Sequence, residues 1–146
     1  MLNLPLNADG ELDPGGELVL EEMAEWISVN GQGIFSTRPW KVYGEGPTRM
    51  PNGNLGKAND IPFTEEDFRF LVKGPMLYAF CMTVPQGSVL IKSLGYETDL
   101  CEKPVSSVKV LGSPVSVDWS QTPQGLRIMP SDHWPCRHAV AYEILF

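Results

Sequence analysis

The sequence predicts a mainly β protein: an antiparallel sandwich of two sheets, of the Greek-key type, preceded by one strand and one helix. Beyond Thr64, seven short runs with apolar residues at alternate positions are separated by turn-forming residues, which is typical of sandwich strands. Before Asn30, apolar residues recur at the spacing of one helix face. The chain has 146 residues, of which 42% are hydrophobic and 20% charged, enough for one ordinary packed domain.

The first 31 residues form the predicted strand and helix. Residues 2–6 are short and apolar and end at the turn-forming Asn7-Ala8-Asp9-Gly10, so we expect a strand buried on both faces. After a loop that contains Pro14-Gly15-Gly16, residues 17–30 have the pattern of an amphipathic helix, which a left-handed residue at Asn30-Gly31 would end. A lone strand and helix leave backbone groups and apolar side chains uncovered, so we expect this segment to pack on the sandwich or to self-associate. The apolar residues available for self-association are Val19, Met23, Trp26 and Ile27.

The composition of the middle of the chain predicts a connection between the first strand and helix and the sandwich. It begins with an aromatic-rich stretch around Trp40 and continues into residues 49–62, which are rich in turn formers and have no period. We therefore expect three parts: residues 1–40 as a β/α unit with its junction, residues 41–61 as a connector loop, and residues 62–146 as the sandwich.

The seven predicted strands follow that connector. Their ranges are 68–72, 78–84, 89–92, 105–111, 115–119, 126–129 and 139–146. Alternation along these runs places one set of side chains between the two sheets. The expected members of this shared core are Phe70, Phe80, Val110, Val117, Ile128 and Tyr142.

Charge and composition exclude several kinds of partner. The net charge of −7 and the acidic pI near 4.7 argue against nucleic acid and against anionic membrane surfaces. No run approaches the roughly 20 apolar residues of a membrane span, and no signal-peptide pattern begins the sequence, so the compartment is left open. The three cysteines, Cys81, Cys101 and Cys136, are too few and too scattered for a disulfide scaffold or a Cys-x-x-Cys metal site. The sequence is consistent either with one disulfide bridge or with three free thiols.

Two groups of polar residues are candidates for a metal-binding or catalytic site. The acidic residues Asp9, Glu11 and Asp13 follow the first strand, but they lack the full pattern of a calcium loop and are better explained as turn residues. His133 and His138 flank Cys136, yet residues five apart on a strand do not share a face. We therefore expect a structural turn there, and no metal or cofactor in the chain.

Three stretches resemble the junction between the catalytic barrel and the C-terminal sandwich of family 29 glycoside hydrolases, the α-L-fucosidases. They are Glu25-Trp26-Ile27-Ser28-Val29-Asn30-Gly31, Gly33-Ile34-Phe35-Ser36-Thr37-Arg38-Pro39-Trp40 and Tyr43-Gly44-Glu45-Gly46-Pro47-Thr48. Residues 2–10 are similar to the last barrel strand and its loop, and residues 89–95 and 108–113 to two sandwich strands. The resemblance covers nearly the whole of this chain but only the last part of the chains of that family.

The resemblance implies that the first strand and helix are the last β/α unit of a (β/α)8 barrel, of which the other units cannot fit in this length. The family is retaining, and its nucleophile and acid/base lie upstream of the part matched, so no catalytic residue is assigned here. Asn7 and Asp9 would face the sugar cleft, because barrel sites lie at the carboxyl ends of strands. Arg38 and Trp40 would adjoin the sugar or, for Trp40, wedge the two parts together.

The resemblance further implies a fucosylated glycan as the partner of the parent enzyme, in a family that is often periplasmic, secreted or lysosomal. Two other hypotheses stay open. One is a carbohydrate-binding module that uses surface aromatics such as Trp134, and the other is an interaction module that docks through its helix.

Overall fold

The computed structural model describes residues 6–49, 61–131 and 133–146. The expected strand at residues 2–6 lies outside this range except for Leu6, which forms an isolated antiparallel bridge with Leu12. Most of the expected loop at residues 49–62 also lies outside the described residues.

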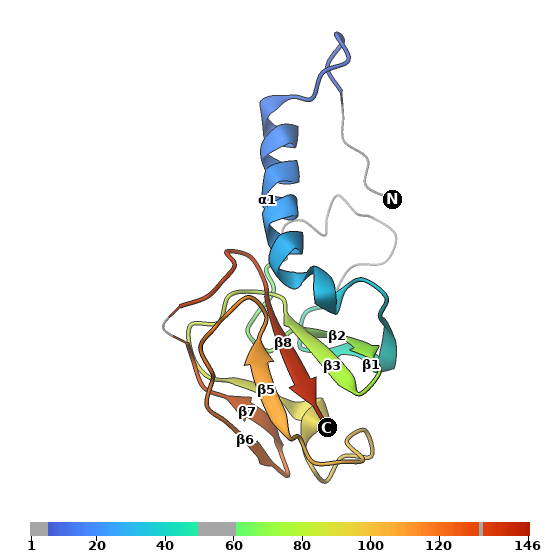
Figure 1. The fold of residues 1–146 in the computed structure, drawn as a ribbon, viewed down its shortest axis with the longest axis vertical. Helices are drawn as coiled ribbons and strands as arrows, with labels where there is room; N and C mark the ends of the chain where they lie inside the picture. Colours follow the sequence, from blue (N-terminus) through green and yellow to red (C-terminus); the bar gives the residue numbers. More distant parts are fainter. Residues whose placement is uncertain (1–5, 50–60, 132) are drawn as a thin grey trace.

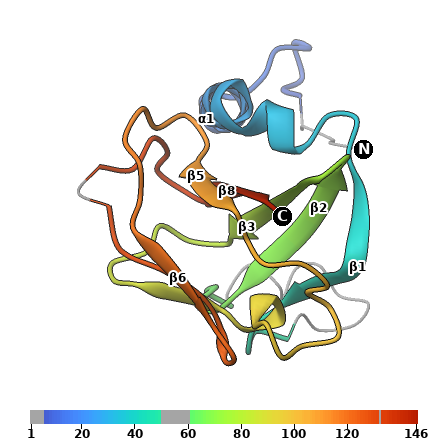
Figure 2. The same cartoon turned by 60° about the horizontal axis from the view of Figure 1, so that its bottom comes forward.

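Two antiparallel sheets make up the body of the protein (Figures 1 and 2). The larger sheet contains, in spatial order, β1 (Arg38–Glu45), β2 (Phe68–Lys73), β3 (Met76–Cys81), β8 (Val140–Leu145) and β5 (Ser107–Val110). The smaller sheet contains β4 (Val89–Ile91), β7 (Gly125–Ile128) and β6 (Trp119–Thr122), and a 3-10 helix, η3 (Lys92–Leu94), follows β4. The chain crosses from one sheet to the other after β3, β4, β5 and β7, as in Greek-key sandwiches. The predicted fold class is confirmed.

The core between the sheets is built by alternate residues of both. Five of the six expected core residues are buried there, namely Phe70, Val110, Val117, Ile128 and Tyr142. Strand alternation accounts for this success, because one face of each strand is apolar and the other is turned outward.

Phe80 is the exception among the expected core residues. It is buried, with 5% of its surface exposed, but it belongs to a second cluster with Tyr78, Leu111 and Ala141 on the opposite face of the larger sheet. In β3 its neighbour Ala79 faces the shared core instead, since successive side chains of a strand point to opposite faces. The prediction that Phe80 lies between the sheets is wrong, because the larger sheet buries both faces of β3.

Helix α1 (Pro14–Asn30) covers that second face with its C-terminal end. It begins three residues before the expected start, so the expected loop at residues 14–16 is its first turn. The Asp13 carboxylate accepts hydrogen bonds from the backbone N–H groups of Gly15 and Gly16 at 2.8 and 2.9 Å, and Pro14 supplies a φ suited to the first helical position. No helix among the described residues has the length and apolar character needed to cross a membrane.

The end of α1 also differs from the expected left-handed cap. Gly31 has φ −56° and continues into a 3-10 helix, η1 (Gly31–Gly33), whose turn is closed by hydrogen bonds from Ile34 and Phe35 to the Gly31 carbonyl. Gly33 lies against the larger sheet, where a Cβ would be 3.0 Å from the Phe80 ring. The close approach of backbone to sheet explains the glycine there.

The expected connector contains a strand. Residues 38–45 form β1, which pairs with β2 at the edge of the larger sheet with an irregularity between Pro39 and Gly44. An edge strand tolerates a proline, because one of its sides is not hydrogen-bonded. The expectation of a loop from residue 41 is therefore wrong for residues 41–45.

The strand expected at residues 115–119 lies farther along the chain. The structure places β6 at Trp119–Thr122, where Trp119 pairs with Ile128 of β7. Val115 is 60% exposed and lies outside any strand, whereas Val117 is buried in the core and Trp119 packs against it partly buried.

Candidate functional site

The C-terminal end of α1 is anchored on the larger sheet. The Trp26 indole lies 6.0 Å from the Phe80 ring, and its N–H donates a hydrogen bond of 2.9 Å to the Ala139 carbonyl. Val29 fits against Gly112, where a Cβ would lie 2.3 Å from Val29 Cγ1. The helix then projects beyond the sandwich toward its N-terminal end (Figure 1).

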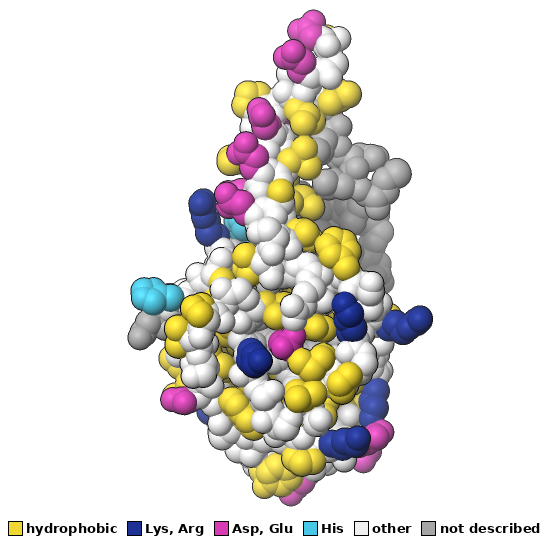
Figure 3. All heavy atoms as spheres, viewed as in Figure 1, with side chains coloured by type: hydrophobic (Ala, Val, Ile, Leu, Met, Phe, Trp, Pro, Cys, Tyr) yellow, Lys and Arg dark blue, Asp and Glu magenta, His cyan; other side chains and the backbone are white. Residues whose placement is uncertain are grey.

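The projecting part of α1 carries an uncovered apolar face. Leu18 is 55% exposed, Val19 46% and Met23 42%. Figure 3 shows hydrophobic side chains along this part of the helix, with acidic side chains along its edge. A shallow hollow of about 310 Å³ continues the face toward the sandwich, lined by Val19, Glu22, Met23, Trp26, Ile27, His138 and Ala139. Trp26 and Ile27 are half-buried, so the face remains open mainly at its N-terminal end.

Asn7 and Asp9 lie in a turn that precedes α1. The Asn7 N–H donates to the Glu11 carbonyl at 2.8 Å, the Gly10 N–H donates to the Asn7 carbonyl, and Gly10 has φ +82°. This is the turn chemistry that the residue types indicate. Both side chains are exposed.

Arg38 and Trp40, the other two residues considered as adjoining a sugar, lie on β1, beyond the opposite end of α1. The 17 residues of α1 span roughly 25 Å at about 1.5 Å per residue. Within this chain the structure therefore does not bring the two pairs into one site.

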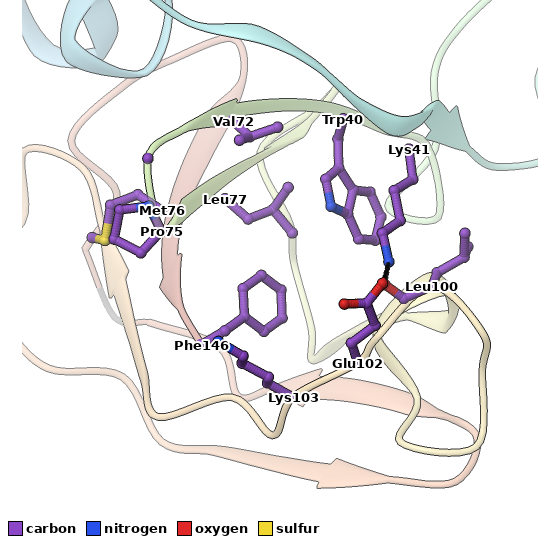
Figure 4. A pocket seen from close by; sticks show the side chains of 11 residues that line it. Trp40, Lys41, Val72, Pro75, Met76, Leu77, Leu100, Glu102, Lys103 and Phe146 are labelled. Carbon is purple, nitrogen blue, oxygen red and sulfur yellow. Dashed lines mark hydrogen bonds and ion pairs between the residues drawn. The ribbon is translucent and has the colours of Figure 1, made fainter.

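Trp40 packs on the sandwich core. Its ring meets Phe70 edge-on, with centroids 5.3 Å apart and an interplanar angle of 74°. The other side of Trp40 lines a hollow of about 210 Å³ at one end of the sandwich (Figure 4). Arg38 is exposed on the same strand.

Residues 133–138 have no regular secondary structure and pack beside α1. His138 Nε2 lies 3.3 Å from Glu22 Oε2, and Cys136 Sγ accepts a hydrogen bond of 3.1 Å from the Asn30 side chain. All three cysteines are free thiols. In the described parts of the chain, no group of three or more His, Cys, Asp or Glu residues could hold a metal ion.

The most completely bonded carboxylate is that of Asp67, a residue which the sequence analysis did not single out. Asp67 is fully buried and accepts four hydrogen bonds of 2.7 to 3.0 Å from the backbone and hydroxyl groups of Thr48 and Thr64. Burial raises the pKa of Asp67, but these hydrogen bonds outweigh burial and hold the pKa below its usual value. The pattern Thr64-x-x-Asp67 resembles a capping box and would have identified part of this arrangement. Its role is to fix the two stretches that flank residues 50–60.

Two curated relatives match most of the chain. The tissue α-L-fucosidase of Bos taurus is 25% identical over 127 residues, which cover 86% of this chain and 22% of the relative. The α-L-fucosidase of Branchiostoma floridae is 26% identical over 144 residues, which cover 95% of this chain and 27% of the relative. The chain thus spans about a quarter of the length of these relatives. No protein-family model matches it.

Solved structures show the same fold. The Thermotoga maritima α-fucosidase, solved with a mechanism-based inhibitor, superposes with a TM-score of 0.71 at 15% identity, covering 100% of this chain and 30% of that one. The α-L-fucosidase isoenzyme 1 of Paenibacillus thiaminolyticus gives a TM-score of 0.63 at 20% identity, covering 99% of this chain and 30% of that one. Sequence and fold agree: over nearly its whole length this chain is similar to part of the α-L-fucosidases, family 29 of the glycoside hydrolases, and the match is consistent with their C-terminal part.

Proposed function

We propose that the chain is a non-catalytic C-terminal part of an α-L-fucosidase-like retaining glycoside hydrolase, and that it stabilises the catalytic barrel of the parent enzyme. In this proposal residues 1–40 supply the last β/α unit and the junction, residues 41–61 the connection, and residues 62–146 the sandwich. The observed β1 joins the junction to the larger sheet, which makes the two parts continuous.

The uncovered apolar face of α1 is the observation that best supports this proposal. Fully burying a Val, Leu or Met side chain stabilises a protein by about 1.5–3 kcal/mol, so covering the exposed parts of Leu18, Val19 and Met23 is worth several kcal/mol. This is comparable with the total stability of many domains, about 5–15 kcal/mol. In a (β/α)8 barrel the outer helices turn their apolar faces to the strands, and barrel strands of the parent would cover this face of α1.

The carboxylates described here do not suit the chemistry. A retaining glycosidase holds two carboxyl groups about 5–5.5 Å apart across the scissile bond. Asp67 is buried, but both of its oxygens are taken by threonines, and Asp13 caps α1. Asp9 and Glu11 are exposed beside a turn, which supplies neither the burial nor the fixed partner that acid/base catalysis requires. We therefore assign the nucleophile and the acid/base to the barrel of the parent.

The substrate of the parent would be a fucosylated glycan. Asn7 and Asp9 follow the position of the last barrel strand and would lie at the rim of the sugar cleft. Arg38 and Trp40 lie on β1, beyond the opposite end of α1 from that rim, so within this part of the protein they do not share it.

Two experiments test the proposal. We expect the purified 146-residue chain to hydrolyse an aryl α-L-fucoside no faster than buffer, and we expect the genomic DNA upstream of Met1 to encode a barrel in the same frame. An inactive preparation made in parallel, for example a chain unfolded by a Tyr142→Asp substitution, controls for host enzymes. Hydrolysis that survives purification and disappears in Asp9→Asn would overturn the proposal, because the chain would then hold its own site.

A further inference from the structure

A hollow at one end of the sandwich combines aromatic rings with a polar rim. It opens between β1, the turn from β2 to β3, and residues 100–103, and its volume is about 210 Å³. Trp40, Leu77 and Phe146 form its apolar wall. Figure 4 shows the rings of Trp40 and Phe146 pointing into the same space from β1 and from the end of β8.

The rim places a hydrogen-bond donor beside an acceptor. Lys41 Nζ lies 2.6 Å from Glu102 Oε1 and donates a second hydrogen bond of 3.2 Å to the Leu100 carbonyl. The hydrogen bond and the positive charge of Lys41 lower the pKa of Glu102 from its usual value. The Lys41 and Glu102 side chains remain 40% and 75% exposed, so each retains hydrogen-bonding capacity toward a ligand.

We propose that this hollow binds a single neutral sugar ring, such as the terminal residue of a glycan. A pyranose has an apolar C–H face, which suits the Trp40 ring, and vicinal hydroxyls that both donate and accept hydrogen bonds. One hydroxyl donates to Glu102 and its neighbour accepts from Lys41. The volume of about 210 Å³ lies below the roughly 300–1,000 Å³ of pockets for drug-sized ligands, and this favours one ring over a longer oligosaccharide.

Of the residues considered above as adjoining a sugar, this site includes Trp40 alone. The turn with Asn7 and Asp9 lies beyond the far end of α1, and the exposed face of α1 is on the other side of the larger sheet from the shared core that Trp40 contacts. Trp134, the example of a surface aromatic residue in the carbohydrate-binding hypothesis, lies edge-on to Tyr142 at 6.5 Å and packs on the core. The new site rests on the proposed function only for the choice of one test sugar.

A nuclear magnetic resonance titration of the ¹⁵N-labelled 146-residue chain tests the site. The probes are methyl α-L-fucoside and methyl β-D-galactoside. We expect saturable shifts of the Trp40 indole N–H and of the backbone N–H groups at residues 100–103, with a millimolar dissociation constant. The chain has four tryptophans, and the indoles of Trp26, Trp119 and Trp134 serve as internal references that should not move.

Matched variants separate this pocket from nonspecific binding. Glu102→Ala removes the rim acceptor from an exposed position, and we expect it to weaken binding about tenfold or more, as the loss of a hydrogen bond to a charged group does. Glu97→Ala makes the same change at an exposed residue of the same loop, outside the pocket, and should bind as the unchanged chain does.

Shifts with one sugar only would identify the preferred ring, and shifts with both would indicate a general sugar site. The absence of saturable shifts with either sugar, or an equal effect of Glu102→Ala and Glu97→Ala, would overturn the proposal. Binding is measured without hydrolysis, so that result would leave the proposed role beside a catalytic barrel intact.

Discussion

The indole N–H of Trp26 donates its hydrogen bond to the carbonyl of Ala139, a residue 113 positions farther along the chain. This contact joins the end of α1 to the start of β8, the strand between β3 and β5. The helix is therefore fastened to the middle of the larger sheet, although most of its length extends beyond the sandwich.

We expect Trp26→Phe to lower the free energy of unfolding by about 1 kcal/mol, because an aromatic ring is kept while the part-buried Ala139 carbonyl loses its partner. Urea unfolding followed by circular dichroism measures the difference. Trp119→Phe is the control, since the Trp119 indole N–H has no hydrogen bond among the residues that the structure describes. Equal stabilities of the two variants would show that the hydrogen bond contributes nothing.

The pH dependence of stability should report Asp67. Its folded pKa is depressed, so its contribution is present above the unfolded value of about 3.9 and is lost as the pH falls through the folded pKa. Asp67→Asn should lower the free energy of unfolding by about 1–3 kcal/mol at pH 7, and by less at pH 3. Urea unfolding at both pH values measures this, with the exposed Asp99→Asn as control. A deficit of the same size at both pH values would contradict the assignment.

Gly112 should be intolerant of a side chain, for two separable reasons. It has φ +77°, and a Cβ would lie 2.3 Å from Val29 Cγ1 of α1. Gly74 also has a positive φ, +56°, but nothing lies within 4 Å of its Cβ position. We expect Gly74→Ala to cost about 1 kcal/mol from the backbone alone and Gly112→Ala to cost more.

Thermal unfolding of these variants measures both effects. The double variant Gly112→Ala, Val29→Ala should recover part of the loss, because it removes the methyl group that clashes. No recovery would mean that α1 does not pack against Gly112 as described.

The isolated chain should self-associate through the face formed by Val19, Met23, Trp26 and Ile27. Val19→Ser with Met23→Ser should shift the equilibrium toward the monomer, because it removes two exposed apolar side chains that line the hollow on this face. Sedimentation velocity over a range of concentrations measures the shift. Val115→Ser, at a residue that is 60% exposed on the sandwich, is the matched control. A chain that stays monomeric at every concentration would contradict this prediction.

Alternation in the sequence identified buried positions better than it identified what covers them. Phe70 and Phe80 both lie on apolar faces of their strands, yet one packs between the sheets and the other under Trp26. The period of a strand says which residues share a face, but a strand that is buried on both sides gives no indication of which layer each face meets. Only the placement of α1 distinguishes the two.

Elements governed by local chemistry or by an edge position were harder to predict. The Asp13 cap extends α1 through a Pro-Gly-Gly stretch whose composition indicates a loop. The residues of β1 include Pro39 and Gly44, and the irregularity between them interrupts any alternation. The Lys41–Glu102 pair joins residues 61 positions apart, so no local pattern could have pointed to that rim.

The position of β8 has a consequence for the order of folding. β8 follows all the other strands in sequence, yet it lies between β3 and β5 and pairs with both. During synthesis the larger sheet can hold only β1, β2 and β3 until residues 140–145 leave the ribosome, and the edge of β3 stays unpaired for that time. Pairings so distant in sequence also slow folding, because a long loop must close before any contact stabilises it. The nascent chain therefore carries an open sheet edge until its last strand can pair.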